Sequence, residues 1–473
     1  MNPPSRTRIR SPLSLPHPRF RMPFLGDIFT LDFTKPTQRL VGHTRDLGGI
    51  YEQRVFGWPA IIVSDTALIN ELNDEQRWEK NVGPIIAKLR TIGGDGLFTA
   101  FNHEPNWRKA HNILMPAFTK AAMINYHDTI TDTVHELIET WDAAAAASAW
   151  IDITAEVNRL TIETISRAGF GYTFNKLSEK AVDPFLAAVL RELKYASRRT
   201  DVLRRYERIF KRKRRAQHYA DKRFIHTQVA EIIETRRHSG PRSNERPDML
   251  DIMLNETDPD SGEALDDDNI TNQILTMLTA GSETSANTIA FALHYLSTNP
   301  DLLACAQAEV DERWPEHTYP DIKFDDVAKL RYLRRVIDET LRLWPVAPGY
   351  FRQAKCDTTI GDGKYPFKAK DWVFVVTLAA HRDPAWGPDA DQFNPDRFLP
   401  ENIRGLPPHT YKPFGVGPRA CIGRQFAIHE VLIALAAIVH RYDIEPQPGY
   451  QLDVSETITL KPAGLRLRLT RRR

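Results

Sequence analysis

The sequence predicts a mainly α fold with a small β portion, organised as one domain around a long central helix. Apolar residues recur every three or four positions through most of the chain between about residues 107 and 296, which is typical of helices. One such stretch has roughly 30 residues, far more than the average helix of about 11–12. Stretches rich in Val, Ile and aromatic residues are short and lie mainly outside this part, so few strands are expected.

The first predicted strands form a hairpin. Ile50–Phe56 and Ala60–Ser64 are rich in β-branched and aromatic side chains, and Gly57-Trp58-Pro59 between them is a turn signal. They predict a β-rich part at about residues 40–70. Three further strands are expected at Tyr350–Cys356, Thr359–Ile360 and Trp372–Leu378.

Most other elements are predicted helices. The long one begins near Asp266-Asp267-Asp268, where acidic side chains favour a helix N-terminus, and ends at Asn299-Pro300. At 1.5 Å per residue it would span roughly 45 Å, and it is apolar on most faces, as expected for a helix that crosses a core. Others are predicted at His127–Ala147, Ile151–Ala168, Ala181–Arg198, Tyr206–Arg236, Ala328–Leu343 and Ile422–His440.

The composition argues against several classes of protein. The 63 basic and 61 acidic residues nearly balance, which disfavours a nucleic-acid-binding protein. The three scattered cysteines argue against a disulfide framework and for a reducing compartment. The N-terminus is rich in Pro and Arg and has no apolar run of the length of a signal peptide or membrane span. We therefore expect a cytoplasmic protein without a transmembrane anchor.

A basic run at residues 198–215 stands out against this balance, and Tyr206 and Phe210 are interleaved with its arginines and lysines. A solvated helical face and loop is the simplest interpretation. Attraction of an anionic substrate, partner or membrane surface is the alternative.

The strongest chemical signal surrounds Cys421, in the segment FGVGPRACIG at residues 414–423. Its glycines let the backbone wrap closely around the sulfur, where amide N–H groups can donate to it. The helix that follows favours the thiolate through the positive end of its dipole. A lone buried Cys is commonly an inert small hydrophobe. This glycine-rich frame before a long helix instead indicates a thiolate ligand.

Three motifs in this order resemble those of the cytochrome P450 family. They are ETLR at residues 339–342, FNPDRF at residues 393–398 and the cysteine segment at residues 414–423. The resemblance covers nearly the whole chain. It implies a triangular, helix-rich single domain over residues 1–473 and a haem b iron bound by the thiolate of Cys421.

The resemblance also assigns a structural role to Glu339, Arg342 and Arg397, which would form a buried ion network that secures the cysteine loop. Without the resemblance to this family, Glu339 and Arg342 are simply an i,i+3 pair on a helix, which stabilises the helix by roughly a few tenths of a kcal/mol.

The long predicted helix carries AGSETS at residues 280–285. A Thr within a helix can bond back to a carbonyl of its own helix, and Gly281 would make room beside the helix for a diatomic ligand and water. A polar patch packed against a neighbour would have the same composition. The resemblance makes Glu283 and Thr284 the acid–alcohol pair that delivers protons for O–O bond cleavage, which the thiolate assists.

Haem also has two propionates that need donors or cations. Trp107 and His111 resemble the family's propionate-binding helix and lie four residues apart, so they share a face. Many members have Arg where His111 stands, and a lone Trp or His is more often a core residue. Arg419, two residues before Cys421, is a further propionate partner. The remaining haem contacts implied by the resemblance are Phe414, Gly415 and Ala280.

Several segments are most similar to the haem domains of self-sufficient bacterial fatty-acid hydroxylases. They are residues 94–99, 111–114, 343–345 and 457–462. This similarity places Phe98 over the haem, where it would limit the approach of a chain terminus and favour oxidation near, rather than at, the end of a long acyl chain. An aromatic residue in a loop is otherwise usually part of a core.

The channel mouth departs from that group. Where the group has an Arg and a Tyr that anchor the substrate carboxylate, this chain has Trp58 and Ile62. Arg54 or the basic run at residues 204–215 could replace them, whereas Trp58 suggests a more apolar mouth that suits neutral substrates.

The chain ends at Arg473 without a flavin or nicotinamide domain. This predicts a separate ferredoxin or flavodoxin with an NAD(P)H-dependent reductase as the electron source. The protein is expected to be a monomer whose other partners are O2 and a small hydrophobic substrate.

The leading hypothesis is a monooxygenase that inserts one oxygen atom into an aliphatic C–H bond, with subterminal hydroxylation of a medium- or long-chain fatty acid. A monooxygenase of a neutral substrate such as a terpenoid is an alternative. A peroxide-driven peroxygenase or haem-thiolate isomerase is another, although such branches typically lack the acid–alcohol pair. A haem-based redox or gas sensor is the non-enzyme alternative, and it would need an output domain.

Overall fold

The structure is a computed structural model that describes residues 15–174, 177–179, 183–197, 212–241, 247–316 and 319–472. The chain divides into two compact units. The first comprises residues 1–81, 338–421 and 454–461, and the second comprises residues 82–337, 422–453 and 462–473.

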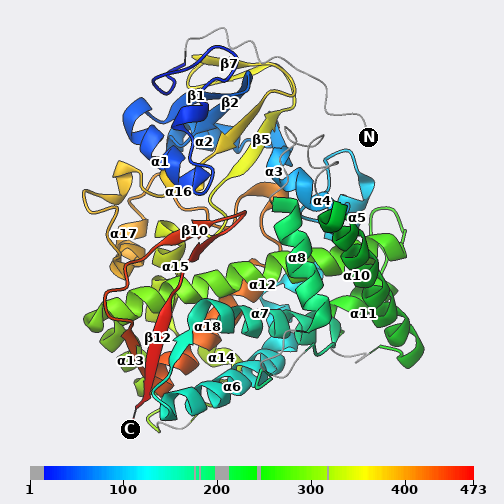
Figure 1. The fold of residues 1–473 in the computed structure, drawn as a ribbon, viewed down its shortest axis with the longest axis vertical. Coiled ribbons are helices and arrows are strands. Elements are labelled where there is room, and N and C mark those ends of the chain that lie inside the picture. Colours follow the sequence, from blue (N-terminus) through cyan, green and yellow to red (C-terminus); the bar gives the residue numbers. More distant parts are fainter. Residues whose placement is uncertain are drawn as a thin grey trace. The chain divides into compact units, whose positions relative to one another are not determined.

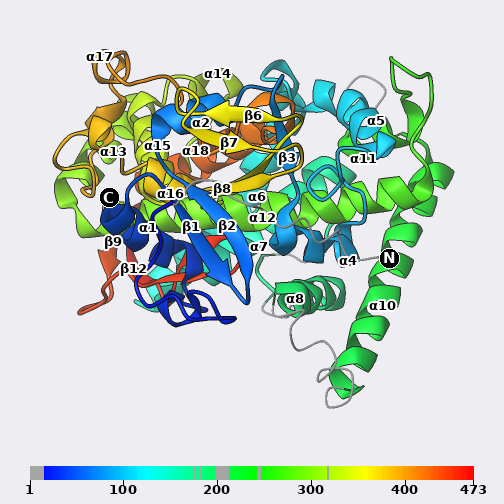
Figure 2. The same ribbon diagram turned by 90° about the horizontal axis from the view of Figure 1, so that it is seen from above.

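A five-stranded sheet forms the centre of the first unit. Its strand order is β1-β2-β8-β5-β3, and only the β2–β8 pair is parallel (Figure 2). The hairpin of β1 and β2 confirms the prediction, although the turn is tighter than expected. Phe56 and Gly57 form it with φ values of 50° and 77°, and Trp58 already pairs with Val55. The strands are β1 (Ile50–Val55), β2 (Trp58–Val63), β3 (Trp78–Asn81), β5 (Tyr350–Ala354) and β8 (Trp372–Val375).

The core of the first unit lies on this sheet. Fully buried apolar side chains from four of the strands pack together with Leu72 of helix α2 (Thr66–Leu72). The predicted strand 372–378 ends early, because Thr377 begins the short helix α16 (Thr377–Ala380). The unit also contains α1 (Pro36–Leu47), the two-stranded sheet of β6 (Thr358–Ile360) and β7 (Tyr365–Phe367), and a pairing of β10 (Val454–Glu456) with β11 (Leu460–Pro462).

The long predicted helix is confirmed as α12 (Asp267–Thr298), which has 32 residues. Asp266 caps its N-terminus by accepting a hydrogen bond from the backbone N–H of Asn269. Most of its side chains are buried, and Figure 1 shows it crossing the second unit beside α7 (Ile153–Phe170) and α18 (Arg424–Arg441). This helix forms the central element of the second unit.

The other helices of the second unit surround α12 (Figure 1). Their bounds are α4 (Arg90–Gly93), α5 (Pro105–Leu114), α6 (Ile124–Ala146), α8 (Pro184–Ser197), α10 (Arg212–Ser239), α11 (Met249–Asn255) and α13 (Pro300–Arg313). A three-stranded sheet in the order β4-β12-β9 completes it, from β4 (Trp150–Asp152), β12 (Arg466–Arg471) and β9 (Tyr442–Pro446).

Several predicted helix bounds are corrected. Ile151 lies in β4, where it pairs with Leu467, and Asp152 then caps α7 through the backbone N–H of Ala155. The predicted helix at residues 328–343 begins only at Arg331, as α15 (Arg331–Leu343), because Ala328 ends α14 (Phe324–Val327). The basic run at residues 198–211 lies outside the described residues. Within the described part of the chain, no helix has the length and apolar character needed to cross a membrane.

Candidate functional site

The loop before Cys421 folds back on itself. The backbone N–H of Cys421 donates to the carbonyl of Phe414 at 2.8 Å, and that of Ala420 donates to Gly417 at 3.0 Å. Gly415 and Gly417 have φ values of 70° and 69°, a region that glycine adopts without strain. The loop holds Cys421 on the surface of its unit, where the residue is exposed and its thiol is accessible to a ligand.

The backbone of Gly417 also lies directly against the Glu75 side chain. A Cβ atom at this position would be 2.4 Å from Glu75 Oε1, so Glu75 would have to shift. Glu75 is held in turn by Arg352, whose Nη1 lies 3.0 Å from the same oxygen. The loop is therefore shaped by an ion pair of its own unit as well as by its glycines.

Glu339 and Arg342 on α15 form a fully buried ion pair. Arg342 donates from Nε to Oε2 at 2.6 Å and from Nη2 to Oε1 at 2.8 Å, and both side chains are 0% exposed. The Nε atom of Arg397 lies 3.5 Å from Glu339 Oε1. Burial raises the pKa of Glu339, although Arg342 and Arg397 oppose this effect. The three residues predicted as a network are therefore in contact.

This ion pair holds the chain segments that lead toward the cysteine loop. Arg342 donates to the carbonyls of His381, Ala390 and Gln392 at 3.0, 2.7 and 3.1 Å. His381 in turn accepts the backbone N–H of Lys412 on Nε2 at 2.9 Å. Burial lowers the pKa of His381 to about 3, so its ring is neutral and can accept this bond. Lys412 lies two residues before Phe414.

Lys80 on β3 is a residue of the first unit that sequence analysis did not select, and its charge is influenced by Arg419. Burial and the charge of Arg419 lower the pKa of Lys80 to about 7. Arg419 was predicted to bind a haem propionate. The sequence gives no signal that Lys80 and Arg419 influence each other, because the two residues are far apart in the chain.

Trp107 and His111 share one face of α5, as their spacing predicts. Their ring centroids are 5.1 Å apart with an interplanar angle of 31°. The Arg108 guanidinium lies 5.9 Å from the Trp107 ring centre. This arrangement presents an indole and an imidazole side by side, and both groups can donate hydrogen bonds to an anion.

The segment 279–284 of α12 bears hydroxyl groups that bond back to the helix. Thr284 Oγ1 donates to the carbonyl of Ala280 at 2.8 Å, and Ser282 Oγ donates to that of Leu278 at 2.6 Å. Ala280, Glu283 and Thr284 are partly exposed, although most of the helix is buried. Their side chains are thus accessible to a ligand within an otherwise packed helix.

Gly281 does not serve the purpose that sequence analysis assigned to it. A Cβ atom at this position would lie 3.7 Å from Ile165 Cγ1 of α7, an ordinary van der Waals contact. The Cβ direction of Gly281 is therefore toward a packed helix, not toward space for a small ligand.

Glu430 on α18 is a buried acid that sequence analysis did not select. It is 1% exposed, and burial raises the pKa of its carboxyl to about 8. The hydroxyls of Ser285 and Thr164 lie near it, but neither carboxyl oxygen makes a hydrogen bond of good geometry. The available signal was an acidic residue at the start of the apolar run Val431–Val439.

Glu430→Gln is expected to flatten the dependence of stability on pH. Because the folded pKa of about 8 exceeds the ordinary 4.5, Glu430 binds its proton more tightly in the folded state. Its contribution to the free energy of unfolding is complete below the unfolded pKa and is lost as the pH rises through the folded pKa of about 8. The free energy of unfolding falls by about 1.4 kcal/mol per pH unit at most. Denaturant unfolding at several pH values measures this slope. Glu401→Gln at the exposed start of α17 (Pro400–Ile403) is the control, and equal slopes for the wild type and Glu430→Gln would contradict the expectation.

The two predicted substrate residues lie in different units. Phe98 is half-buried in a loop of the second unit, and Trp58 is 63% exposed at the start of β2 in the first. Arg54, a possible carboxylate anchor, is paired with Glu52 through bonds of 2.7 and 3.2 Å. Its charge is therefore already compensated, which counts against that role.

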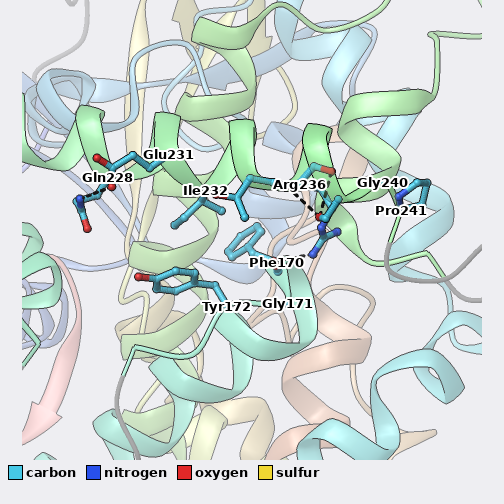
Figure 3. A pocket seen from close by; sticks show the side chains of 11 residues that line it. Phe170, Gly171, Tyr172, Gln228, Glu231, Ile232, Arg236, Gly240 and Pro241 are labelled. Atoms are coloured by element: carbon cyan, nitrogen blue, oxygen red, sulfur yellow. Dashed lines mark hydrogen bonds between the residues drawn. The ribbon is translucent and has the colours of Figure 1, made fainter.

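A hollow of about 450 Å³ lies in the second unit between the end of α7 and the C-terminal half of α10 (Figure 3). Arg236 lines it but is occupied by Asp248, Asp251 and the carbonyl of Phe170. None of the predicted site residues lines this hollow.

Comparison with known proteins agrees with the three motifs. The profile of the cytochrome P450 family matches residues 16–469. A bifunctional cytochrome P450/NADPH–P450 reductase of Bacillus cereus is 40% identical over 97% of this chain and 42% of its own length. The self-sufficient cytochrome P450 monooxygenase CYP505E3 of Phanerodontia chrysosporium is 35% identical over 93% of this chain and 41% of its own.

Solved structures agree as well. The crystal structure of a cytochrome P450 (CYP102L1) is 58% identical, with a TM-score of 0.92 over 98% of this chain and 100% of that one. The haem domain of cytochrome P450DA is 35% identical, with a TM-score of 0.89 over 97% of this chain and 98% of that one. These similarities confirm the predicted fold.

The prediction of a separate ferredoxin or flavodoxin is wrong by this comparison. The curated relatives named above are self-sufficient or bifunctional proteins, and this chain spans about 42% of the length of the Bacillus cereus protein, which carries its own reductase. The end of the chain at Arg473 therefore says nothing about the source of electrons. The chain belongs to the cytochrome P450 family of haem-thiolate monooxygenases, whose cofactor is haem b held by a cysteine thiolate.

Proposed function

We propose that the protein inserts one atom of O2 into an aliphatic C–H bond, and that its substrate is a medium- or long-chain fatty acid oxidised at a subterminal carbon. The observation that carries the proposal is the accessible Thr284 hydroxyl on α12, next to Glu283, in a chain that also has the Cys421 loop. A gas sensor or a peroxygenase would not need this pair of proton-delivering groups.

The residues of the chain fit haem b chemically. Cys421 supplies an accessible thiolate in a loop shaped by Gly415 and Gly417. Arg419 in the first unit, and Trp107 with His111 in the second, supply a cation and N–H donors of the kind that propionates need. Phe414, Gly415 and Ala280 would contact the ring. Bound haem supplies the reductive activation of O2.

Thr284 and Glu283 act on protons. The Thr284 hydroxyl donates to the Ala280 carbonyl, which leaves its oxygen lone pairs as acceptors. Rotation about its Cβ–Oγ1 bond turns the hydroxyl proton away from this carbonyl, so that the hydroxyl donates to a ligand beside the helix. Glu283 precedes it in the chain and is partly exposed, so water reaches its carboxyl, and a proton passes to Thr284 through water because adjacent residues of a helix do not face each other.

Thr284→Ala is expected to uncouple electron consumption from product formation. Removal of the hydroxyl removes a controlled proton donor, so the yield of product per electron pair should fall about tenfold or more. Thr288→Ala is the matched control, because Thr288 makes the same type of bond to the Thr284 carbonyl at 2.9 Å one turn further along. Product and NADPH consumption are measured with an added electron source. A Thr284→Ala variant that couples as well as Thr288→Ala would refute the role.

The fatty-acid proposal rests on Phe98 and on the similarity of residues 94–99 to fatty-acid hydroxylases. The exposed Trp58 and the pairing of Arg54 with Glu52 favour a second candidate, a neutral hydrophobic substrate such as a terpenoid.

Binding measurements with fatty acids and alcohols of graded chain length decide between the two candidates. Saturated fatty acids and alcohols of the same lengths are titrated into the haem-loaded protein, and the ferric spin state is followed by its absorption spectrum. We expect fatty acids to shift the spin state with an optimum in chain length. If only the alcohols or terpenoids shift the spin state, the substrate is a neutral molecule and not a fatty acid.

A further inference from the structure

The loop at residues 94–99, which carries Phe98, is fastened to α12 and α5 through Asp95. Asp95 Oδ1 accepts hydrogen bonds from the Nδ2 groups of Asn269 and Asn272 on α12, both at 2.9 Å. Asp95 Oδ2 accepts one from Asn106 Nδ2 on α5 at 2.8 Å. We call these four residues the amide clamp.

A second tie holds the loop one residue before Phe98. The backbone N–H of Leu97 donates to Gln273 Oε1 on α12 at 3.0 Å. Gln273 is 0% exposed, and its Nε2 donates to Asn269 Oδ1 at 3.0 Å. The two ties therefore share Asn269, and a continuous chain of hydrogen bonds connects Asp95 with the backbone beside Phe98.

The loop backbone also lies directly on α12. A Cβ atom on Gly94 would be 2.3 Å from Asn272 Nδ2, and one on Gly96 would be 2.2 Å from Thr276 Oγ1. A Cβ atom on Gly96 would also lie 2.8 Å from the backbone carbonyl oxygen of Asn272, so glycine is what allows the loop to pack directly against α12.

The charge of Asp95 strengthens the clamp. Burial alone would raise the pKa of this carboxyl, but the hydrogen bonds from Asn106, Asn272 and Asn269 outweigh burial and lower it. The carboxylate is therefore ionised at neutral pH, and hydrogen bonds to an ionised acceptor are stronger than those between neutral groups. Replacement of Asp95 by alanine would therefore remove three hydrogen bonds at once.

We propose that the amide clamp positions the Phe98 loop and thereby determines which carbon of a bound chain is oxidised. This inference rests on the proposed role of Phe98 in limiting the approach of the chain. Asp95 is a positioning residue, because it acts through the loop and not by touching substrate. A displacement of about 1 Å at a reacting group is enough to change its reactivity strongly.

The first test is backbone hydrogen–deuterium exchange in the haem-loaded protein without substrate. We expect the amides of residues 95–99 to exchange about tenfold faster in Asp95→Ala, and less than that in Asp95→Asn, which retains one acceptor oxygen. Asn272→Ala removes a single bond and keeps the test available if Asp95→Ala does not fold. The matched control is Asn112→Ala on α5, because Asn112 also donates from Nδ2 to two carboxylates, those of Asp258 and Asp260.

The second test is the distribution of products along a saturated fatty acid and along the alcohol of the same length. We expect the share of the main positional product to fall about twofold in Asp95→Ala and to be partly rescued in Asp95→Asn, with Asn112→Ala unchanged. A variant that merely loses stability would lower the total yield without moving the position of oxidation.

Two outcomes would overturn the inference. Either the 95–99 amides exchange at the wild-type rate in Asp95→Ala and Asn272→Ala, or they exchange faster while the product distribution stays the same. If the wild type binds the alcohol but not the fatty acid, the fatty-acid proposal fails while both tests of the clamp still apply.

Discussion

Arg342→Ala is expected to destabilise the protein by about 3–5 kcal/mol, because it leaves a buried carboxylate without its partner. Arg342 and Glu339 are both 0% exposed and share two hydrogen bonds. Arg342 also satisfies three backbone carbonyls at residues 381, 390 and 392, which the alanine variant would leave without these donors. Its guanidinium lies 5.1 Å from the centre of the Trp386 ring as well.

Arg342→Lys separates charge from geometry. Lysine keeps the positive charge but cannot donate two parallel bonds to Glu339 while also reaching the carbonyls, so most of the loss should remain. The midpoint of denaturant unfolding is followed by far-ultraviolet circular dichroism for both variants.

Arg45→Ala is the matched control in the same unit. Arg45 donates to both carboxylate oxygens of Asp391, but the two side chains are 62% and 63% exposed. An exposed pair contributes roughly 0–1 kcal/mol, so this variant should unfold close to the wild type. A loss for Arg342→Ala no greater than for Arg45→Ala would show that the buried pair does not secure the fold.

Elements with a local signal were predictable from the sequence. The β1–β2 hairpin follows from β-branched residues around the turn signal Gly-Trp-Pro, although the turn itself is at Phe56 and Gly57, and α12 follows from its periodicity and its acidic N-terminus. Errors of bounds arose where tertiary pairing overrides propensity. The apolar periodicity of α7 extends back to Ile151 and predicts that this residue is helical. Its backbone instead pairs with Leu467, more than 300 residues away in the chain.

The contact among Glu339, Arg342 and Arg397 could be predicted from motifs, whereas contacts between residues far apart in the chain could not. The i,i+3 pair of Glu339 and Arg342 has little meaning in the sequence, and its burial at 0% exposure gives it its energetic weight. Lys80 and Asp95 were missed because their partners Arg419 and Asn272 are brought to them only by the folded chain. No periodicity or composition encodes such pairs.

Cys421→Ser is expected to abolish the red-shifted Soret band of the ferrous–CO complex, along with monooxygenase activity. A serine hydroxyl is not ionised at neutral pH and its oxygen is a poor substitute for the electron-rich sulfur that ligates haem iron in this family. The loop itself should survive, because its bonds are made by the backbone, from Cys421 N–H to the Phe414 carbonyl and from Ala420 N–H to Gly417.

Two other cysteines provide matched controls for this variant. Cys305 lies on α13 in the second unit and Cys356 follows β5 in the first, and both are exposed like Cys421. Their Ser variants should keep the ferrous–CO spectrum and the haem content of the wild type. Exposure alone therefore does not distinguish the three thiols. Only the loop of residues 414–421, with two glycines at positive φ and its backbone closed onto Phe414, singles out one of them. If the red-shifted band is retained in Cys421→Ser or lost in Cys356→Ser, Cys421 is not the haem ligand. The proposed chemistry would then lose its basis.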